Sequence, residues 1–138
     1  MNALLKILSV LLLLFNTIGA VYGGLHLILH PDGSSIGLSL DWLKHSPFDS
    51  YLIPGFVLLL ANGLFGLFVL WQVLSGRKSA AFYVLIQGCL LTGWILIQIL
   101  MLQSVYFLHY ISGSVGLVLI ISGFLMWRIG NPSNSTSS

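Results

Sequence analysis

The chain has 138 residues, of which 57% are hydrophobic and only 6% are Asp, Glu, Lys or Arg. Soluble domains carry about 25% charged residues, so this composition excludes a water-soluble globule and places the chain in a lipid bilayer. The net charge of +2 is spread over five basic and three acidic side chains, which excludes the clustered basic surface of a nucleic-acid-binding protein. A single cysteine excludes an intramolecular disulfide and paired-cysteine chemistry.

Four stretches of the chain are long and apolar enough to cross a bilayer, which takes about 20 mainly apolar residues. They predict spanning helices over residues 4–29, 51–74, 80–103 and 108–129. Because the later connections are short, consecutive helices should be antiparallel neighbours. The sequence therefore predicts an all-α integral membrane four-helix bundle, with residues 1–130 as one transmembrane domain and residues 131–138 as a disordered cytoplasmic tail.

The first span has a second interpretation, as a secretory signal. Lys6 precedes an apolar core over residues 7–15, and the small residues Gly19 and Ala20 follow it. The apolar run continues to residue 29, beyond the end of a short signal core, so we favour an uncleaved span. N-terminal sequencing that began at Val21 would contradict this prediction.

The longest connection, residues 30–50, follows the first span. Residues 31–34, Pro-Asp-Gly-Ser, have the composition of a turn. Residues 39–45 predict a short helix at the membrane interface, with Leu40 and Leu43 on one face. Trp42 in this segment suits the interface because an indole has an apolar body and a polar N–H.

The start of the second helix is open to two interpretations. Ser46 and Pro47 have the pattern of a helix cap and first turn, which predicts a helix that begins before the lipid-buried part of the span. Pro54 then either kinks that helix at the membrane boundary or marks the true start of the span.

The basic residues predict an orientation. Lys6, Arg77, Lys78 and Arg128 fall on one side of the membrane if the four spans alternate, whereas Lys44 and all three aspartates fall on the other. Cytoplasmic loops carry the excess of Lys and Arg, so we expect both termini in the cytoplasm.

Amide side chains are the main polar groups expected inside the spans. Charged groups at depth are absent, which argues against proton pumps and voltage sensors. Asn16, Asn62 and Gln87 form a predicted polar seam, and Gln98 shares a helix face with Gln87 and Trp94. We favour packing between helices as its role; the alternative is the wall of a ligand pocket or solute path.

The four histidines all fall on the side opposite Lys6, Arg77, Lys78 and Arg128. His26 and His30 share a face at the end of the first span, His45 lies in the long connection and His109 begins the fourth span. Histidine is a common ligand of haem and of metals, so His26, His30 and His109, with Trp94 and Gln98, are the candidate ligand-binding residues for a quinone or haem. The alternative is a purely interfacial role, and no metal-ligand spacing assigns a metal.

Small residues at i, i+4 spacing let helix backbones approach closely. Three such pairs occur: Gly19 with Gly23, Gly88 with Thr92, and Ser112 with Gly116. They serve either the bundle itself or contact with a second copy or a partner membrane protein. Cys89 is expected to be a buried, apolar filler.

Several short motifs resemble those of small bacterial four-helix membrane proteins similar to the DoxX group. They are residues 23–26, 31–34, 46–48, 52–55 and 93–95, the last with Gln98. The resemblance implies a bacterial inner-membrane protein, with relatives linked to quinone-dependent sulfur oxidation or to membrane redox complexes. The shared motifs consist of packing and turn residues, so the resemblance assigns no catalytic residue to this chain. The lack of a second cysteine argues against dithiol chemistry.

Three functions follow from these patterns. We favour the first, a non-catalytic accessory or assembly component of a membrane complex, embedded among lipids. The second is a binder of quinone or haem near the histidines, and the third is a carrier of a small neutral solute along the amide seam. No pattern of residues identifies a reaction.

Overall fold

The computed structural model describes residues 3–37, 40–44, 46–102 and 107–130. The long helices are α1 (Ala3–Leu29), α4 (Ala80–Leu102) and α5 (Phe107–Gly130). The second span, Leu52–Leu74, consists of α2 (Leu52–Leu58), the π-helical segment η3 (Leu59–Leu64) and α3 (Phe65–Leu74) without a break. The predictions for His45, for the side chain of Trp42 and for the tail at 131–138 lie outside the described residues.

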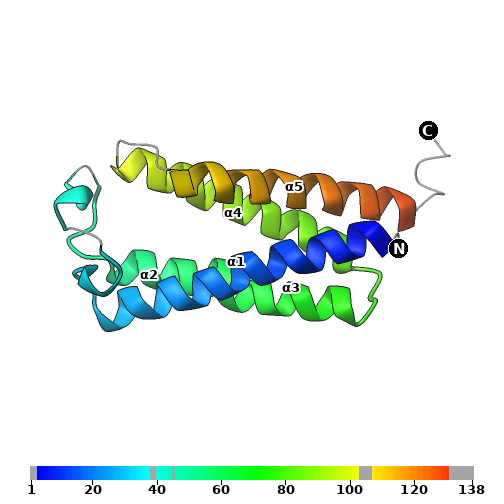
Figure 1. The fold of residues 1–138 in the computed structure, drawn as a ribbon, viewed down its shortest axis with the longest axis horizontal. Helices are drawn as coiled ribbons and strands as arrows, with labels where there is room; N and C mark the ends of the chain where they lie inside the picture. Colours follow the sequence, from blue (N-terminus) through cyan, green and yellow to red (C-terminus); the bar gives the residue numbers. More distant parts are fainter. Residues whose placement is uncertain (1–2, 38–39, 45, 103–106, 131–138) are drawn as a thin grey trace.

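The helices form an antiparallel bundle of two hairpins (Figure 1). One hairpin pairs α1 with the second span, and the other pairs α4 with α5. The start of α1 and the end of α5 lie together at one end of the bundle, here called the termini end, and the long first connection lies at the opposite, loop end. The all-α four-helix prediction is thus confirmed, and the predicted spans agree with the helices to within one residue.

Glycine allows close backbone contact within each hairpin. A Cβ added to Gly24 of α1 would stand 2.8 Å from Leu59 Cβ and 3.1 Å from the carbonyl oxygen of Gly55 in α2. In the other hairpin, a Cβ on Gly88 would stand 2.7 Å from the backbone nitrogen of Ile120 and 2.8 Å from the carbonyl oxygen of Gly116. Side chains at these positions would force the helices apart, so glycine sets the spacing in both hairpins.

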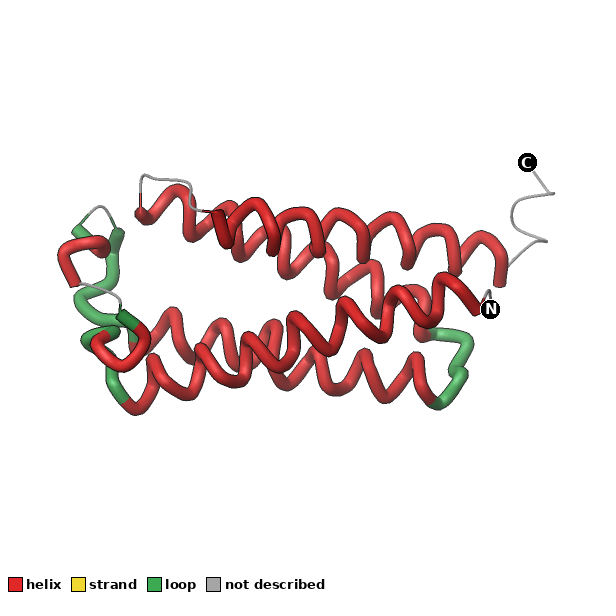
Figure 2. The backbone as a smooth tube through the Cα atoms, viewed as in Figure 1, coloured by secondary structure: helices red, strands yellow, loops and turns green. Residues whose placement is uncertain are grey.

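The two hairpins contact each other most closely toward the termini end. Ser9 Oγ lies 4.0 Å from Met126 Sδ between α1 and α5, and Ser79 Oγ donates to Gln72 Oε1 at 2.8 Å beside the short connection at 75–79. In the view of Figure 2, the hairpins spread apart toward the loop end. There the 3₁₀ segment η2 (Leu40–Leu43) packs against α4.

The second helix begins later than the cap pattern at Ser46 predicts. Ser46 Oγ accepts from the Phe48 backbone N–H at 3.2 Å and donates to the Leu43 carbonyl at 2.8 Å, so Ser46 stabilises a turn. The helix starts at Leu52, with Pro54 in its first turn, where proline breaks no hydrogen bond. Of the two interpretations, Pro54 therefore marks the start of the span.

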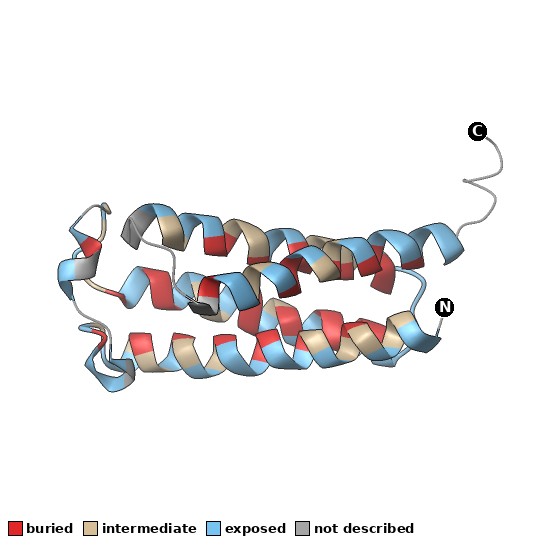
Figure 3. Cartoon of the chain, turned by 45° about the horizontal axis from the view of Figure 1, so that its top comes forward, coloured by how far each residue is buried: buried red, intermediate tan, exposed pale blue. Residues whose placement is uncertain are grey.

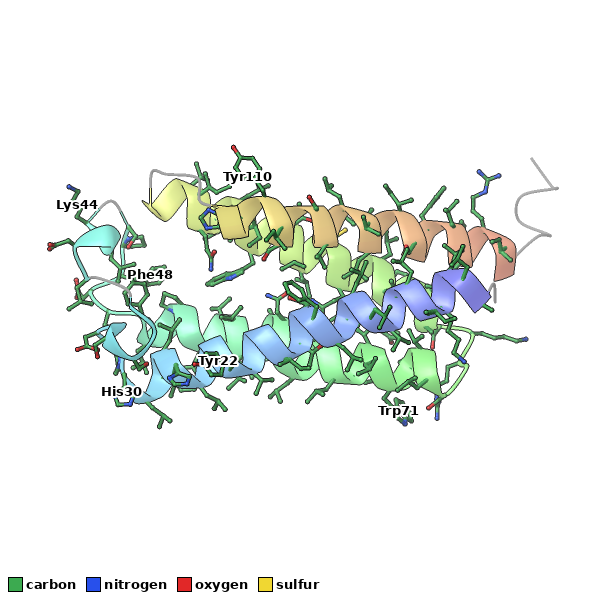
Figure 4. The ribbon with its side chains drawn as sticks, viewed as in Figure 1. Tyr22, His30, Lys44, Phe48, Trp71 and Tyr110 are labelled. Atoms are coloured by element: carbon green, nitrogen blue, oxygen red, sulfur yellow. The ribbon has the colours of Figure 1, made fainter. Side chains whose placement is uncertain are left out.

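The predicted interfacial helix is only the single turn η2, and its two leucines do not share an environment. Leu43 is buried with Leu27 and Tyr51, whereas Leu40 is exposed. Phe48 packs against this small cluster and projects from the first connection toward the bundle (Figure 4). The segment closes the loop end of the bundle with one leucine and one aromatic side chain.

Large apolar side chains cover the outside of the bundle. Exposed examples occur on every span, including Leu11, Phe56, Leu96 and Leu117, while the buried residues face the other helices (Figure 3). Four helices, Ala3–Leu29, Leu52–Leu74, Ala80–Leu100 and His109–Ile129, are long and apolar enough to cross a bilayer. This chain is therefore a small, four-span integral membrane protein.

Candidate functional site

Two of the predicted ligand-binding residues, His109 and Gln98, meet between α4 and α5 near the loop end, and Trp94 lies one turn away on α4. His109 Nε2 lies 3.2 Å from Gln98 Oε1, so the ring N–H donates to the amide oxygen in the tautomer that carries its proton on Nε2. Trp94, one helical turn before Gln98, is 7% exposed and His109 is 6% exposed. We call His109, Gln98 and Trp94 the loop-end site.

The other two predicted histidines do not join this site. His26 Nδ1 lies 3.0 Å from Ser35 Oγ, and its ring packs on Tyr22 with the ring centroids 4.3 Å apart. His30 is exposed at the loop end of α1 (Figure 4), where its carbonyl accepts from Gly33. No group of three or more His, Cys, Asp or Glu side chains suited to a metal ion exists among the described residues.

The predicted turn after α1 is present and carries local hydrogen bonds of its own. Asp32 Oδ1 accepts from the Ser34 backbone N–H at 3.0 Å and from Ser34 Oγ at 2.8 Å. Both bonds favour the carboxylate and hold the pKa of Asp32 below its usual range. Gly33 has φ of 79°, which suits glycine. The Asp32 oxygen is thus engaged in the turn.

A second polar site lies in the middle of the bundle and uses two residues of the predicted seam. Gln87 Nε2 of α4 donates to Asn62 Oδ1 at 3.0 Å and contacts the Ala61 carbonyl oxygen at 3.4 Å. Asn62 and Ala61 belong to η3, where the Phe65 N–H bonds back five residues to Leu60. Such π segments often occur at functional sites. Here the Gln87 amide donates to a backbone carbonyl inside the π segment.

Thr17 of α1 completes this second site. A Cβ on Gly66 would collide with Thr17 Oγ1 and would stand 3.4 Å from Gln87 Oε1, so both oxygens face the backbone of α3 at Gly66. Thr17 is 3% exposed, and Asn62 and Gln87 are fully buried. We call Thr17, Asn62, Gln87 and Gly66 the mid-bundle site. Asn16 is also buried, and its Nδ2 has no hydrogen-bond partner among the described residues.

Sequence reasoning missed Thr17 and the Gln72–Ser79 pair. Thr17 is next to Asn16 in the sequence, but a threonine hydroxyl in an apolar helix usually bonds to its own backbone, so nothing in its spacing distinguished it. Gln72 lies one turn before the end of a span, where polar side chains are ordinary. In both cases the partner comes from another helix, which the sequence does not identify.

The expectation for Cys89 was wrong, because this thiol is exposed on the lipid-facing side of α4. Its neighbour Gly88 takes the buried position against α5. Of the small-residue pairs, Gly88 and Thr92 both face Gly116 inside the bundle. Gly19 is exposed, and a Cβ there would meet nothing within 4 Å among the described residues.

The fold and the two sites define a four-span integral membrane protein whose polar side chains at depth lie mostly inside the bundle. No family model, curated protein or solved structure matches this chain. The resemblance to the DoxX group therefore stays a prediction.

Proposed function

We propose that this protein binds a quinone-class molecule, an apolar compound with a carbonyl-bearing head, at the loop-end site. The observation that carries the proposal is the His109–Gln98 pair, 3.2 Å apart, beside the buried Trp94. Binding sites for small apolar molecules combine a mostly hydrophobic lining with a few placed polar groups and an aromatic surface. The loop-end site supplies the placed polar groups and the aromatic side chain.

The hydrogen bond between His109 and Gln98 also orients the amide. Because Gln98 Oε1 accepts from the His109 ring, the Nε2 side of Gln98 is the donor that the amide can offer to a ligand. A quinone carbonyl accepts such a bond, and an indole presents a face on which a quinone ring can stack. In this proposal Gln98 and Trp94 contact the ligand, and His109 positions Gln98.

Quinone is favoured over haem by the places of the histidines. The Nε2 atom of His109 is engaged with Gln98, and His26 is engaged with Ser35 and Tyr22. A second axial histidine is therefore not near the first. The resemblance to proteins linked with quinone-dependent oxidation points in the same direction.

Ligand binding is also favoured over a purely accessory role. The assembly hypothesis rested on small-residue faces, and of these Gly88, Thr92 and Gly116 are occupied in contacts within the chain, whereas Gly19 is exposed. The side chain of Ser114 is exposed on a span, yet it bonds to the Tyr110 carbonyl of its own helix at 2.7 Å. The polar side-chain atoms that have no partner among the described residues are buried inside the bundle, away from a surface that another subunit could cover.

For location, we propose the inner membrane of a bacterium with both termini in the cytoplasm. Lys6 of α1 and Arg128 of α5 lie near the termini end of the bundle. Arg77 and Lys78 lie in the short connection at that same end. Lys44 lies at the loop end (Figure 4). This asymmetry supports the orientation by the positive-inside rule.

Quenching of tryptophan fluorescence by decylubiquinone tests the binding proposal. In nanodiscs, the full chain should show saturable quenching that Trp94→Phe largely removes. Trp71→Phe is the matched control, because Trp71 is exposed near the termini end with Arg77 over its ring at 4.4 Å. Gln98→Leu should weaken the apparent affinity about tenfold, the equivalent of one hydrogen bond of about 1.4 kcal/mol.

Two results would overturn this proposal. One is quenching that rises linearly with quinone and falls equally in both tryptophan variants, since that pattern reports partition into lipid. The other is the absence of quenching together with a second protein that is co-extracted at constant stoichiometry, which would favour the accessory role.

A further inference from the structure

The mid-bundle site contains polar atoms without partners deep inside the membrane domain. Thr17 Oγ1, Asn62 Nδ2 and Gln87 Oε1 are buried and have no hydrogen-bond partner within the described part of the chain. They come from α1, η3 and α4, so three of the four spans contribute to one group. The group includes a donor, an acceptor and a hydroxyl that does both.

Leaving such atoms unpaired is costly at this depth. Hydrocarbon offers no hydrogen bonds, so an unsatisfied polar group in a spanning helix has no alternative partner in the lipid. Buried polar atoms in folded proteins are nearly always satisfied by protein or by bound water. The unpaired atoms of Thr17, Asn62 and Gln87 therefore indicate that the site holds another molecule.

The hydrogen bond between Gln87 and Asn62 decides which polar atoms stay available. Asn62 Oδ1 is taken by the Gln87 amide at 3.0 Å, which leaves Asn62 Nδ2 as the donor and Gln87 Oε1 as the acceptor. Gln87 Oε1 and Thr17 Oγ1 both approach the point where a Cβ of residue 66 would stand. A side chain at position 66 would collide with the Thr17 hydroxyl, so glycine there allows both oxygens to approach the same point of α3.

The chemistry of the atoms selects the class of ligand. A cation would meet the amide N–H group of Asn62, and an anion would find no Lys or Arg in the middle of any span. We infer that the mid-bundle site binds a small, uncharged molecule that both donates and accepts hydrogen bonds. Water is the smallest member of this class, and a small amide or alcohol is the larger alternative source of the same chemistry.

This site is separate from the loop-end site. Gln87 and Gln98 are 11 residues apart on α4, about 16 Å along a helix axis. The buried side chain of Leu91 lies between Gln87 and Trp94 on the same face. Failure of quinone binding at Trp94 would therefore leave the inference about the mid-bundle site intact.

A bound molecule here would join the two hairpins. Thr17 and Asn62 belong to the first hairpin, and Gln87 belongs to the second. Since glycine-mediated contacts hold each hairpin together internally, a ligand shared by the three residues adds hydrogen bonds across the interface between the hairpins. The ligand should therefore raise the stability of the whole bundle.

Replacement of Thr17 by valine, which has the same shape, tests occupancy. If the site holds a ligand, Thr17→Val removes a bond to it, and the midpoint of SDS-induced unfolding of the full chain moves to lower SDS. If the site is empty, the variant removes an unpaired hydroxyl and the midpoint moves higher. Ser114→Ala is the control, because the Ser114 hydroxyl is exposed and bonds to its own helix. Its midpoint should stay unchanged.

Nuclear Overhauser spectroscopy on the same protein identifies the occupant. The side-chain amide protons of Asn62, assigned by their loss in Asn62→Leu, should show a cross peak at the water frequency or cross peaks to the carbon-bound protons of a co-purified solute. The first result identifies water and the second identifies a small amide or alcohol. The absence of both, with a higher unfolding midpoint for Thr17→Val, would overturn the inference.

Discussion

The interfaces within the hairpins differ from the interface between them. Within each hairpin, backbones meet directly at glycine, as at Gly24 with Gly55 and at Gly88 with Gly116. Between the hairpins, apolar side chains from both hairpins form the buried core, and a polar contact from Gln87 to Asn62 crosses the bundle as well. Close backbone packing gives strength without hydrogen bonds in lipid, whereas the polar contact between the hairpins leaves atoms available to a ligand.

This difference suggests that the hairpins are the stable units and that the mid-bundle site belongs to the surface between them. The His109–Gln98 pair of the loop-end site, in contrast, joins α4 to α5 within the second hairpin. The Gln87–Asn62 bond crosses from one hairpin to the other, and Trp94 lies on the same face of α4 as Gln87. Substitutions in the two kinds of interface should therefore have different consequences.

The largest effect is expected inside the second hairpin. In Gly88→Val, the new Cβ would lie within 2.8 Å of backbone atoms of both Ile120 and Gly116, and backbone cannot move aside as a side chain can. We expect a loss of about 3 kcal/mol in the free energy of unfolding, measured by SDS titration.

Gly93→Val on the same helix is the matched control, because a Cβ on Gly93 would meet nothing within 4 Å among the described residues. It should change the free energy of unfolding by less than about 0.5 kcal/mol. Equal losses in the two variants would show that helix propensity, and not contact between α4 and α5, dominates.

An intermediate effect is expected between the hairpins. Gln87→Leu removes the donor to Asn62 Oδ1 and to the Ala61 carbonyl, and Asn62 stays fully buried. The free energy of unfolding should fall by about 2 kcal/mol. The double variant Asn62→Leu/Gln87→Leu should recover part of this loss, because it removes both polar partners. Strictly additive losses would indicate that the two amides do not interact.

The smallest effect is expected in the exposed turn after α1. In the folded protein, the two bonds from Ser34 lower the pKa of Asp32 below its ordinary value of 3.8. The bonds therefore stabilise the turn fully above pH 3.8, and this contribution is lost as the pH falls through the lowered pKa. Carbon-13 NMR of the carboxyl group measures the titration.

In Ser34→Ala the pKa of Asp32 should move part of the way toward 3.8, because the backbone N–H bond remains. Ser35→Ala is the control, since Ser35 bonds to His26 and makes none of the bonds to Asp32 described above. An unchanged Asp32 titration in Ser34→Ala would contradict the role of the Ser34 hydroxyl.

Much of the fold was predictable because lipid imposes simple rules. Apolar length alone located the spans, and short connections made them antiparallel neighbours. The histidines and amides were less predictable. His109 and Gln98 are together because α4 and α5 run side by side, whereas His26 bonds to Ser35 through the fold of the first connection. Spacing along one helix reveals a shared face and does not reveal the partner of that face.

The sequence by itself determined that this is a four-span membrane protein with few charges and several amides at depth, since hydrophobic length and composition depend only on the order of residues. The tertiary structure alone decided which small residues pack, that Cys89 faces outward, and that Gln87 meets Asn62 on a π segment. These outcomes depend on the rotation and crossing of helices, which follow from side-chain packing between spans far apart in the sequence.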